Sequence, residues 1–350
     1  MNEPIAPPTS QSEIMEWYRQ QEPLYNGVCK VVATTLKSLL ATRKIDYLDV
    51  THRTKALDDV IEKISRKQYK DPKKEITDIA GIRVIAFIES DVDRISELVK
   101  NSFNIHPEAT LDKLIDLGVD RTGYRSVHFV CDLGVERTRL PEFSPYKDMT
   151  FEIQVRTVLQ HAWAEIVHDR NYKLSGVLPK DLQRRFYILA GVLELVDSQF
   201  DSLAAEFDRF SGEVTSKTQA GDLNIELSST SVLKYFVEGP QRIQNAPIDR
   251  SNEVIFTMAI TELLDFGIAT IAELDKLVSD EYIDAVRQAS GKPPIIGFLR
   301  GAMMFSDIDK YFSQAWKKHF QGFTPTTNTI LANKYGSPKI DEIVSGYFKD

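Results

Sequence analysis

Apolar residues recur at two different spacings along the first two thirds of the chain. Over residues 28–43 they return every three or four positions, which predicts one face of a packing helix. Runs rich in β-branched and aromatic residues predict strands over 45–51, 76–87, 124–133 and 149–157. Helical spacing returns over 91–103, 158–171 and 179–210. Strands alternating with helices in this way predict a mixed sheet backed by helices.

The last third of the chain has a different pattern. Helical periodicity stops where small and polar residues dominate, which predicts a linker over 211–223. Short helical patterns then follow over 254–266, 271–277, 281–289 and 305–320. The predicted organisation is a tail (1–26), a first domain with a helical extension (27–210), the linker, and a helical C-terminal domain (224–350) to which the pattern assigns no role. The predicted fold class is α+β, a mixed β-sheet flanked by helices and followed by a mainly α-helical domain.

Composition narrows the class of protein. A chain of 350 residues with 42% hydrophobic content is long enough for two domains. Its formal net charge of −8 disfavours a general nucleic-acid coat, although it leaves a local basic groove open. Cys29 and Cys131 stand beside aliphatic residues, as reduced packing thiols do. With no secretory pattern and no apolar run of about 18 residues, a cytoplasmic protein without a membrane partner is predicted.

Two carboxylates interrupt apolar strands of the predicted sheet. Asp78 and Glu152 each stand beside an isoleucine in such a strand. A buried charge is costly unless it is paired, metal-bound or solvated in a cleft. If the strands bring the two carboxylates together, they form an oxygen site suited to Mg²⁺. Structural ion pairs with Arg83 and Arg156 are the alternative, and spacing alone favours that alternative.

A group of cations follows the first predicted strand. Arg53, Lys55 and Lys63 lie on the turn and helix after it, where they can cradle triphosphate oxygens. The cations continue from Arg66 to Lys74 with carboxylates between them, so a solvated charged face is the simpler interpretation of this segment alone. Neither a GxxxxGK[ST] loop nor a GxGxxG motif occurs, which leaves a P-loop or Rossmann nucleotide site unsupported.

Three polar residues share one face of the strand over 124–133. Tyr124, Ser126 and His128 point together by the period-two rule. Tyr124 follows a glycine, so its ring can lie close to a nucleobase, although it can equally cap the sheet. Three aligned polar side chains indicate a solvated face rather than a core.

Four motifs occur in the order and approximate spacing of the RelA/SpoT nucleotidyltransferase domain, and the chain resembles this alarmone synthetase family. They are RTK (53–55) with Lys63, DIAGIRVI (78–85), GYRSVH (123–128), and FEIQVRT (151–157) followed by QHAWAEIVHDRNYK (160–173). The resemblance covers roughly 28–173, with the helix to residue 210 as the extension of small synthetases. It does not cover the C-terminal region. It implies a nucleotidyltransferase-like fold for the first domain.

The resemblance also implies a reaction and its donor site. The expected enzyme is a diphosphotransferase that makes (p)ppGpp from ATP and GDP or GTP. Arg53 is expected to stack on the adenine, and Lys55 and Lys63 to hold the ATP phosphates. Asp78 and Glu152 are expected to bind Mg²⁺, and Glu152 also to assist deprotonation of the acceptor's 3′-hydroxyl.

The acceptor site is implied in the same way. Tyr124 is expected to stack on the guanine, with His128, Gln154 and Arg156 as further contacts. Asp59 and the sequence GVDRTGY before Arg125 depart from the family pattern, so the acceptor stays open.

Other interpretations of the family resemblance remain. No N-terminal hydrolase domain is recognised, so synthesis without hydrolysis is expected. The first alternative is a toxic relative that pyrophosphorylates the 3′ end of tRNA, with 66–74 as the only candidate basic approach. The second is an inactive nucleotide-sensing interaction protein. Small synthetases often form oligomers, so a homo-oligomer is also open.

Overall fold

The computed structural model describes residues 11–108, 111–112, 126–173, 179–251 and 257–348. The chain divides into two units, residues 1–204 and 205–350, and each has its own apolar core. Among the helices of the described ranges, none combines the length and the apolar character that crossing a membrane requires.

The first unit is built on a mixed sheet with the strand order β1-β2-β6-β5-β3, and β4 pairs with β5. The strands are β1 (Asp49–Thr54), β2 (Ala80–Ala86), β3 (Asn104–Ile105), β4 (Leu111–Asp112), β5 (Val127–Asp132) and β6 (Phe151–Thr157). β2 and β6 are parallel, and their outer neighbours β1 and β5 run antiparallel to them. The predicted mixed sheet flanked by helices, with a helical C-terminal domain, is confirmed.

The two faces of this sheet differ in polarity, as period-two alternation requires. Ile82 and Val84 of β2 and Ile153 and Val155 of β6 are at most 1% exposed and belong to the apolar core. Helices α1 (Gln11–Arg43) and α4 (Glu89–Ser102) contact these strands and supply the rest of that core. The opposite face carries the intervening polar residues and therefore holds the candidate site.

Helix α1 begins earlier than the sequence pattern predicts. It starts at Gln11 and passes through Pro23, so residues 11–26 are helical rather than a tail. Ile14, Tyr18 and Tyr25 are buried, and the Tyr18 hydroxyl donates a hydrogen bond to the Lys55 carbonyl. Glutamates and a proline between these apolar residues hide their periodicity in the sequence. The contact with Lys55 ties the start of the helix to the segment that carries the predicted donor site.

Further helices join and flank the strands of the first unit. They are α2 (Leu57–Lys67), α3 (Pro72–Glu75), α5 (Gly134–Thr138), the 3₁₀ turn η1 (Ser144–Tyr146), α6 (Val158–Lys173) and α7 (Lys180–Gln219). The predicted end of the last helix near residue 210 is wrong, because α7 continues through most of the expected linker. Val214 of α7 is buried in the core of the second unit, which explains the extension.

Two carboxylates of α7 hold it to the sheet unit. Asp197 accepts a hydrogen bond from the Thr157 hydroxyl at 2.5 Å, and both side chains are at most 1% exposed. Asp201 accepts one from the backbone N–H of Ser90 at 2.8 Å, in the first turn of α4. Asp201 thus satisfies a backbone donor that the start of α4 leaves unpaired.

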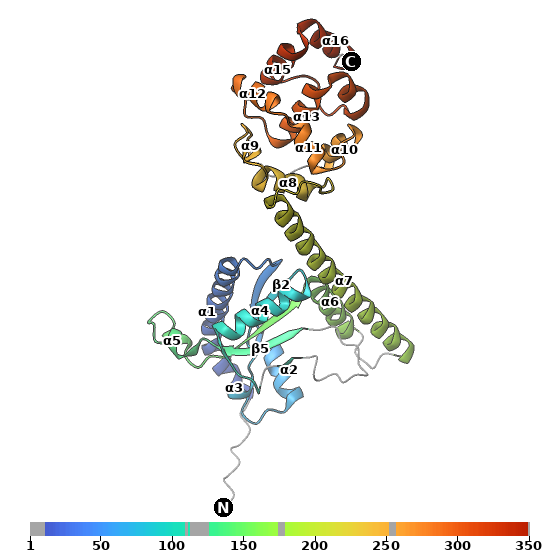
Figure 1. Ribbon diagram of the computed structural model, residues 1–350. Helices are drawn as coiled ribbons and strands as arrows, with labels where there is room; N and C mark the ends of the chain where they lie inside the picture. The colour runs from blue at the N-terminus through green and yellow to red at the C-terminus, as the bar shows by residue number, and fades with distance from the viewer. Residues whose placement is uncertain (1–10, 109–110, 113–125, 174–178, 252–256, 349–350) are drawn as a thin grey trace, which may run out of the picture. The chain divides into compact units, whose positions relative to one another are not determined.

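The second unit is a helical bundle, coloured yellow-brown to red in Figure 1. Its helices are α8 (Ser229–Glu238), α9 (Gln241–Gln244), α10 (Thr257–Asp265), α11 (Ile271–Leu277), α12 (Asp280–Gln288), α13 (Ile295–Ser306), α14 (Ile308–Lys310), η2 (Tyr311–Ala315), α15 (Pro325–Tyr335) and α16 (Ser337–Tyr347). The predicted helix over 305–320 is wrong. Asp307 instead caps a new short helix, and the π-helical turn η2 follows it.

Candidate functional site

A row of paired residues crosses the polar face of the sheet. Arg53 of β1 is opposite Gly81 of β2, and Gly81 is opposite Glu152 of β6. Paired residues point to the same face, so Arg53 and Glu152 flank a position without a side chain. A Cβ atom at Gly81 would lie 3.7 Å from the Arg53 carbonyl oxygen, an ordinary contact. Packing therefore does not require this glycine, and its absent side chain leaves space on the polar face.

Asp78 lies two residues before β2 rather than within a strand, and two lysines hold it. Lys55 Nζ is 2.6 Å and Lys63 Nζ is 2.7 Å from Asp78 Oδ2. Burial opposes ionisation of this carboxyl, but the hydrogen bonds and charges of the two lysines outweigh it and lower its pKa. The second oxygen, Oδ1, is buried and has no hydrogen-bond partner. Asp78 is thus a carboxylate with one oxygen left to receive a ligand.

Glu152 sits in a chain of hydrogen bonds along β5 and β6. His128 Nδ1 is 2.7 Å from Glu152 Oε1, and Gln154 donates to Oε2 at 2.8 Å. The other ring nitrogen of His128 is 2.7 Å from the Ser126 hydroxyl. Burial opposes ionisation of Glu152, but His128 and Gln154 outweigh it and lower the pKa, while the charge of Asp78 acts in the opposite sense. The two carboxylates therefore lie close enough to influence each other.

Arginines gather on the same face beside the carboxylates. Arg83 Nη1 donates to Glu165 of α6 at 2.9 Å, and Arg156 donates to the Gln154 side chain. The Nε atoms of Arg83 and Arg156 are buried without hydrogen-bond partners. Burial and the charge of Arg83 lower the pKa of Arg156 to about 10. Crowded, partly unsatisfied guanidinium groups are suited to receive an anion.

The structure brings most of the predicted site residues together. Asp78 joins Lys55 and Lys63, while Glu152 joins His128 and Gln154. The ion-pair alternative named the wrong partners, because Arg83 contacts Glu165 and Arg156 contacts Gln154 instead. Tyr124 lies outside the described residues.

The sequence did not predict that Glu165 of α6 is the acidic partner of Arg83. His161 and Glu165 lie one turn apart, with 3.7 Å between His161 Nδ1 and Glu165 Oε1. Burial and then the charge of Arg83 lower the pKa of His161. A signal existed in the sequence, because Arg83 shares a strand face with Gly81 and so had to point to the polar side.

The carboxylates fit Mg²⁺ better than a structural metal. Within the described ranges, no group of three or more His, Cys, Asp or Glu side chains is arranged to hold an ion. Mg²⁺ is usually bound through one or two carboxylates, and water and substrate phosphates complete its shell. Asp78, with a buried oxygen that lacks a partner, and Glu152 supply that donor set. A closed zinc site would need four protein ligands.

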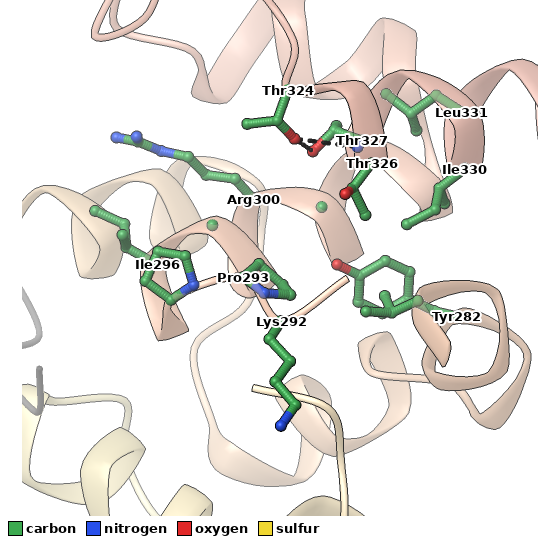
Figure 2. A pocket seen from close by; sticks show the side chains of 14 residues that line it. Tyr282, Lys292, Pro293, Ile296, Arg300, Thr324, Thr326, Thr327, Ile330 and Leu331 are labelled. Carbon is green, nitrogen blue, oxygen red and sulfur yellow. Dashed lines mark hydrogen bonds between the residues drawn. The ribbon is translucent and has the colours of Figure 1, made fainter. Parts of the chain in front are cut away.

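A separate cavity of ≈ 430 Å³ lies within the second unit, among α12, α13 and α15. Figure 2 shows Thr324, Thr326 and Thr327 on one side of it and the Tyr282 ring on another. Although Arg300 lines this cavity, its guanidinium binds Glu262 through two nitrogens, at 2.8 and 2.6 Å. Apolar side chains and hydroxyls thus form most of the wall, and no sequence motif predicted it.

Part of the first unit matches a known protein family. Residues 52–177 match the family described as "Region found in RelA / SpoT proteins". The chain contains a RelA/SpoT region. The predicted resemblance is thereby confirmed, and every predicted site residue from Arg53 to Arg156 falls within this RelA/SpoT region.

Named relatives align with about half of the chain. GTP pyrophosphokinase YwaC of Bacillus subtilis (strain 168) is 28% identical over 162 residues, which are 45% of this chain and 73% of the relative. GTP pyrophosphokinase YjbM of the same organism is 29% identical, over 45% of this chain and 72% of its own. The crystal structure of small alarmone synthetase 1 from Bacillus subtilis has 25% identity and a TM-score of 0.47, and the match covers 55% of this chain and 98% of that one.

Proposed function

We propose that this chain is a GTP pyrophosphokinase, which transfers the pyrophosphoryl group of ATP to the 3′-hydroxyl of GDP or GTP and so makes (p)ppGpp. The observation that carries the proposal is that Asp78, held by two lysines, lies two residues before β2, while Glu152, held by a histidine, lies on the neighbouring strand β6, both inside the RelA/SpoT region. The activity of the two named relatives, both GTP pyrophosphokinases, supports it.

The donor side of the mechanism uses cations that are already in place. Lys55 and Lys63 now face Asp78, and bound ATP would give them phosphate oxygens to neutralise. Arg53 is exposed at the end of β1, beside the space above Gly81, where its guanidinium can stack on the adenine. Positioning and charge neutralisation supply most of the catalysis in phosphoryl transfer.

The acceptor side needs a group that takes a proton. The 3′-oxygen forms a bond to the β-phosphorus, the bond between that phosphorus and the α-phosphate oxygen breaks, and AMP leaves. Glu152 accepts the proton of the 3′-hydroxyl, and its lowered pKa keeps it ionised and ready to do so. Mg²⁺, held by Asp78 and Glu152, would supply charge stabilisation for the phosphates.

Recognition of the acceptor is proposed for residues around Glu152. His128, Gln154 and Arg156 lie along one hydrogen-bonded chain with Glu152, so contact with the nucleotide would position the base at the same time. Tyr124 is proposed to stack on the guanine.

Incubating the purified chain with Mg²⁺, GDP and ATP labelled in its β-phosphate tests the proposal. We expect labelled ppGpp and release of AMP. Glu152→Gln should lower turnover by about 10²- to 10⁴-fold, the usual contribution of a general base. Glu97→Gln, an exposed change on α4, is the matched control and should keep full turnover. Absence of product with both GDP and GTP would refute the proposed function, and turnover that depends on Glu152 would exclude an inactive nucleotide sensor.

The same assay separates the finer proposals. Synthesis without hydrolysis predicts that added ppGpp releases no pyrophosphate. For the alternative tRNA acceptor, the supporting observation is that Arg66, Lys67, Lys70, Lys73 and Lys74 are all exposed. Labelled tRNA that is lost on charge reversal of Lys70 and Lys73, with nucleotide turnover kept, would favour that acceptor. If tRNA stays unlabelled in the assay, tRNA is excluded as the acceptor.

A further inference from the structure

Helix α1 contacts three consecutive residues of the proposed donor segment, 53–55. The Tyr18 hydroxyl donates a hydrogen bond to the backbone carbonyl of the last of them, Lys55. Asn26 accepts one from the hydroxyl of the middle residue at 2.7 Å, and the Cys29 thiol donates one to the carbonyl of the first at 3.4 Å. The three α1 residues are eight and then three positions apart, so they share one face of the helix. This face therefore holds the chain from which the donor cations extend.

Lys55 is held at three points. Its backbone N–H donates to the Ile79 carbonyl at 2.8 Å, and its Nζ lies 2.6 Å from Asp78 Oδ2. Its backbone carbonyl is the third point, which Tyr18 holds. Helix α2 begins two residues later, and its N-cap residue, Ala56, makes no side-chain capping hydrogen bond. Tyr18 thus supplies from α1 a restraint that the start of α2 does not give to this turn.

The surroundings of Tyr18 keep its hydroxyl in place and protonated. The side chain is 2% exposed and belongs to the apolar core of the first unit, so the ring has little freedom to move. Burial, with the negative charges of Glu22 and Asp59, raises the pKa of Tyr18 to about 12. The hydroxyl therefore remains a hydrogen-bond donor throughout the pH range of an enzyme assay.

We propose that Tyr18 is a positioning residue for Lys55, whose backbone it fixes so that Nζ points to where the ATP phosphates bind. This proposal rests on the proposed function, which assigns Lys55 to those phosphates. A binding group must be held close to its productive position, because a displacement of about 1 Å already costs much of its effect. Tyr18 lies outside the RelA/SpoT region, residues 52–177, so the donor site extends beyond that region into α1.

Tyr18→Phe tests the proposal, because it removes the hydroxyl and keeps the buried ring. Calorimetry with Mg²⁺ and an ATP analogue that carries a methylene group between its α- and β-phosphorus should show affinity weakened by about 3- to 10-fold. The KM for GDP should stay within about twofold, since the proposed acceptor contacts lie on β5 and β6. Tyr25→Phe is the matched control and should keep both values. Tyr25 is buried on the same helix, and its hydroxyl makes no hydrogen bond among the described residues.

A double-mutant cycle with Lys55→Ala separates positioning from a general structural role. If Tyr18 acts through Lys55, adding Tyr18→Phe to Lys55→Ala should change the affinity for the analogue by less than about twofold. Equal weakening with and without Lys55 would show a structural effect and overturn the proposal. Equal affinity of Tyr18→Phe and the parent, or no binding of the analogue by the parent, would overturn it as well. Absence of ppGpp while Tyr18→Phe still weakens binding of the analogue through Lys55 would refute only the proposed reaction.

Discussion

At the scale of single residues, His128 connects the proposed base to the rest of the polar face. Its Nδ1 lies 2.7 Å from Glu152 and is a main cause of the lowered pKa of that carboxyl. His128→Ala removes this effect, so the pKa of Glu152 rises and the ionised base is lost at a higher pH. We expect the acid limb of kcat/KM to move upward. Turnover should then fall by about 10- to 100-fold, more at about pH 6 than at about pH 8.

Initial rates across this pH range, with the concentration of GDP varied, measure the shift. Ser126→Ala is the control, since Ser126 contacts the other nitrogen of His128 and leaves the bond to Glu152 in place. An acid limb at the same pH in His128→Ala and the parent would contradict the prediction.

Asp78 gives a stability prediction with a defined sign. Its pKa is lowered from the ordinary value of 3.8 by Lys55 and Lys63, against the effect of burial. The folded state therefore gains stability from the ionised group at pH values above the unfolded pKa, and loses it as the pH falls through the folded pKa. Asp78→Asn should lower the free energy of unfolding by about 1–3 kcal/mol at neutral pH. Below about pH 4 the difference should shrink.

Urea unfolding of the parent and Asp78→Asn at several pH values checks this prediction. Asp71→Asn is the matched control, because Asp71 is more exposed and faces Lys74, whose side chain is 85% exposed. A difference that stayed constant to the lowest pH at which the chain folds would show that the carboxylate charge does not matter.

The sequence identified the candidate carboxylates more readily than their partners in the structure. Asp78 and Glu152 were detectable because a charge in an apolar run demands an explanation. The lysine partners of Asp78 were not assigned, since Lys55 follows β1 and Lys63 lies on α2, and no local spacing records that both approach the segment before β2. Arg83 and Arg156 were offered as partners because they are near in sequence, yet the structure gives them other acceptors.

At the scale of elements, the start of α4 depends on a side chain from α7. The residue before α4, Ile88, offers no side-chain cap, and Asp201 accepts the hydrogen bond from the Ser90 N–H instead. Asp201→Ala should lower the free energy of unfolding of the first unit by about 1 kcal/mol, as loss of a helix cap does. Amide hydrogen exchange in the first turn of α4 should accelerate. Asp208→Ala, the same change at an exposed position of α7, should have no such effect on α4. Unchanged protection of Ser90 in Asp201→Ala would contradict this capping role.

Element types were easier to predict than element ends. The four longer strands were predicted because β-branched runs are distinctive, whereas β3 and β4, with two residues each, were missed. Helix α1 was shortened because glutamates and Pro23 obscure its first turns. The helix expected over 305–320 fails for a different reason. Its apolar residues keep a helical spacing, but Asp307 starts a new helix by accepting from the Lys310 N–H, and η2 then shifts the register. Periodicity cannot detect a break that preserves the apolar face.

At the scale of the whole molecule, the two units differ in what organises them. The first unit places polar residues on an open sheet face, where they can meet substrates. The second unit buries a polar network within an apolar core, since Glu262 is 0% exposed and binds both Arg300 and Tyr311. Burial opposes the charge of Arg300, but Glu262 outweighs it and raises the pKa of the guanidinium. This network therefore stabilises the second unit from inside.

Removing Glu262 should therefore weaken the second unit selectively. Glu262→Ala leaves Arg300 charged and largely buried without its carboxylate, a change that costs about 3–5 kcal/mol. For a unit of this size the melting temperature should fall by about 10 °C, both in the full chain and in residues 205–350 expressed alone, measured by calorimetry. Glu281→Ala breaks an exposed ion pair with Lys334 instead, and should leave the melting temperature nearly unchanged. Equal effects of the two changes would mean that the buried network contributes no more than a surface pair. Failure of 205–350 to unfold cooperatively would mean that its core depends on the rest of the chain.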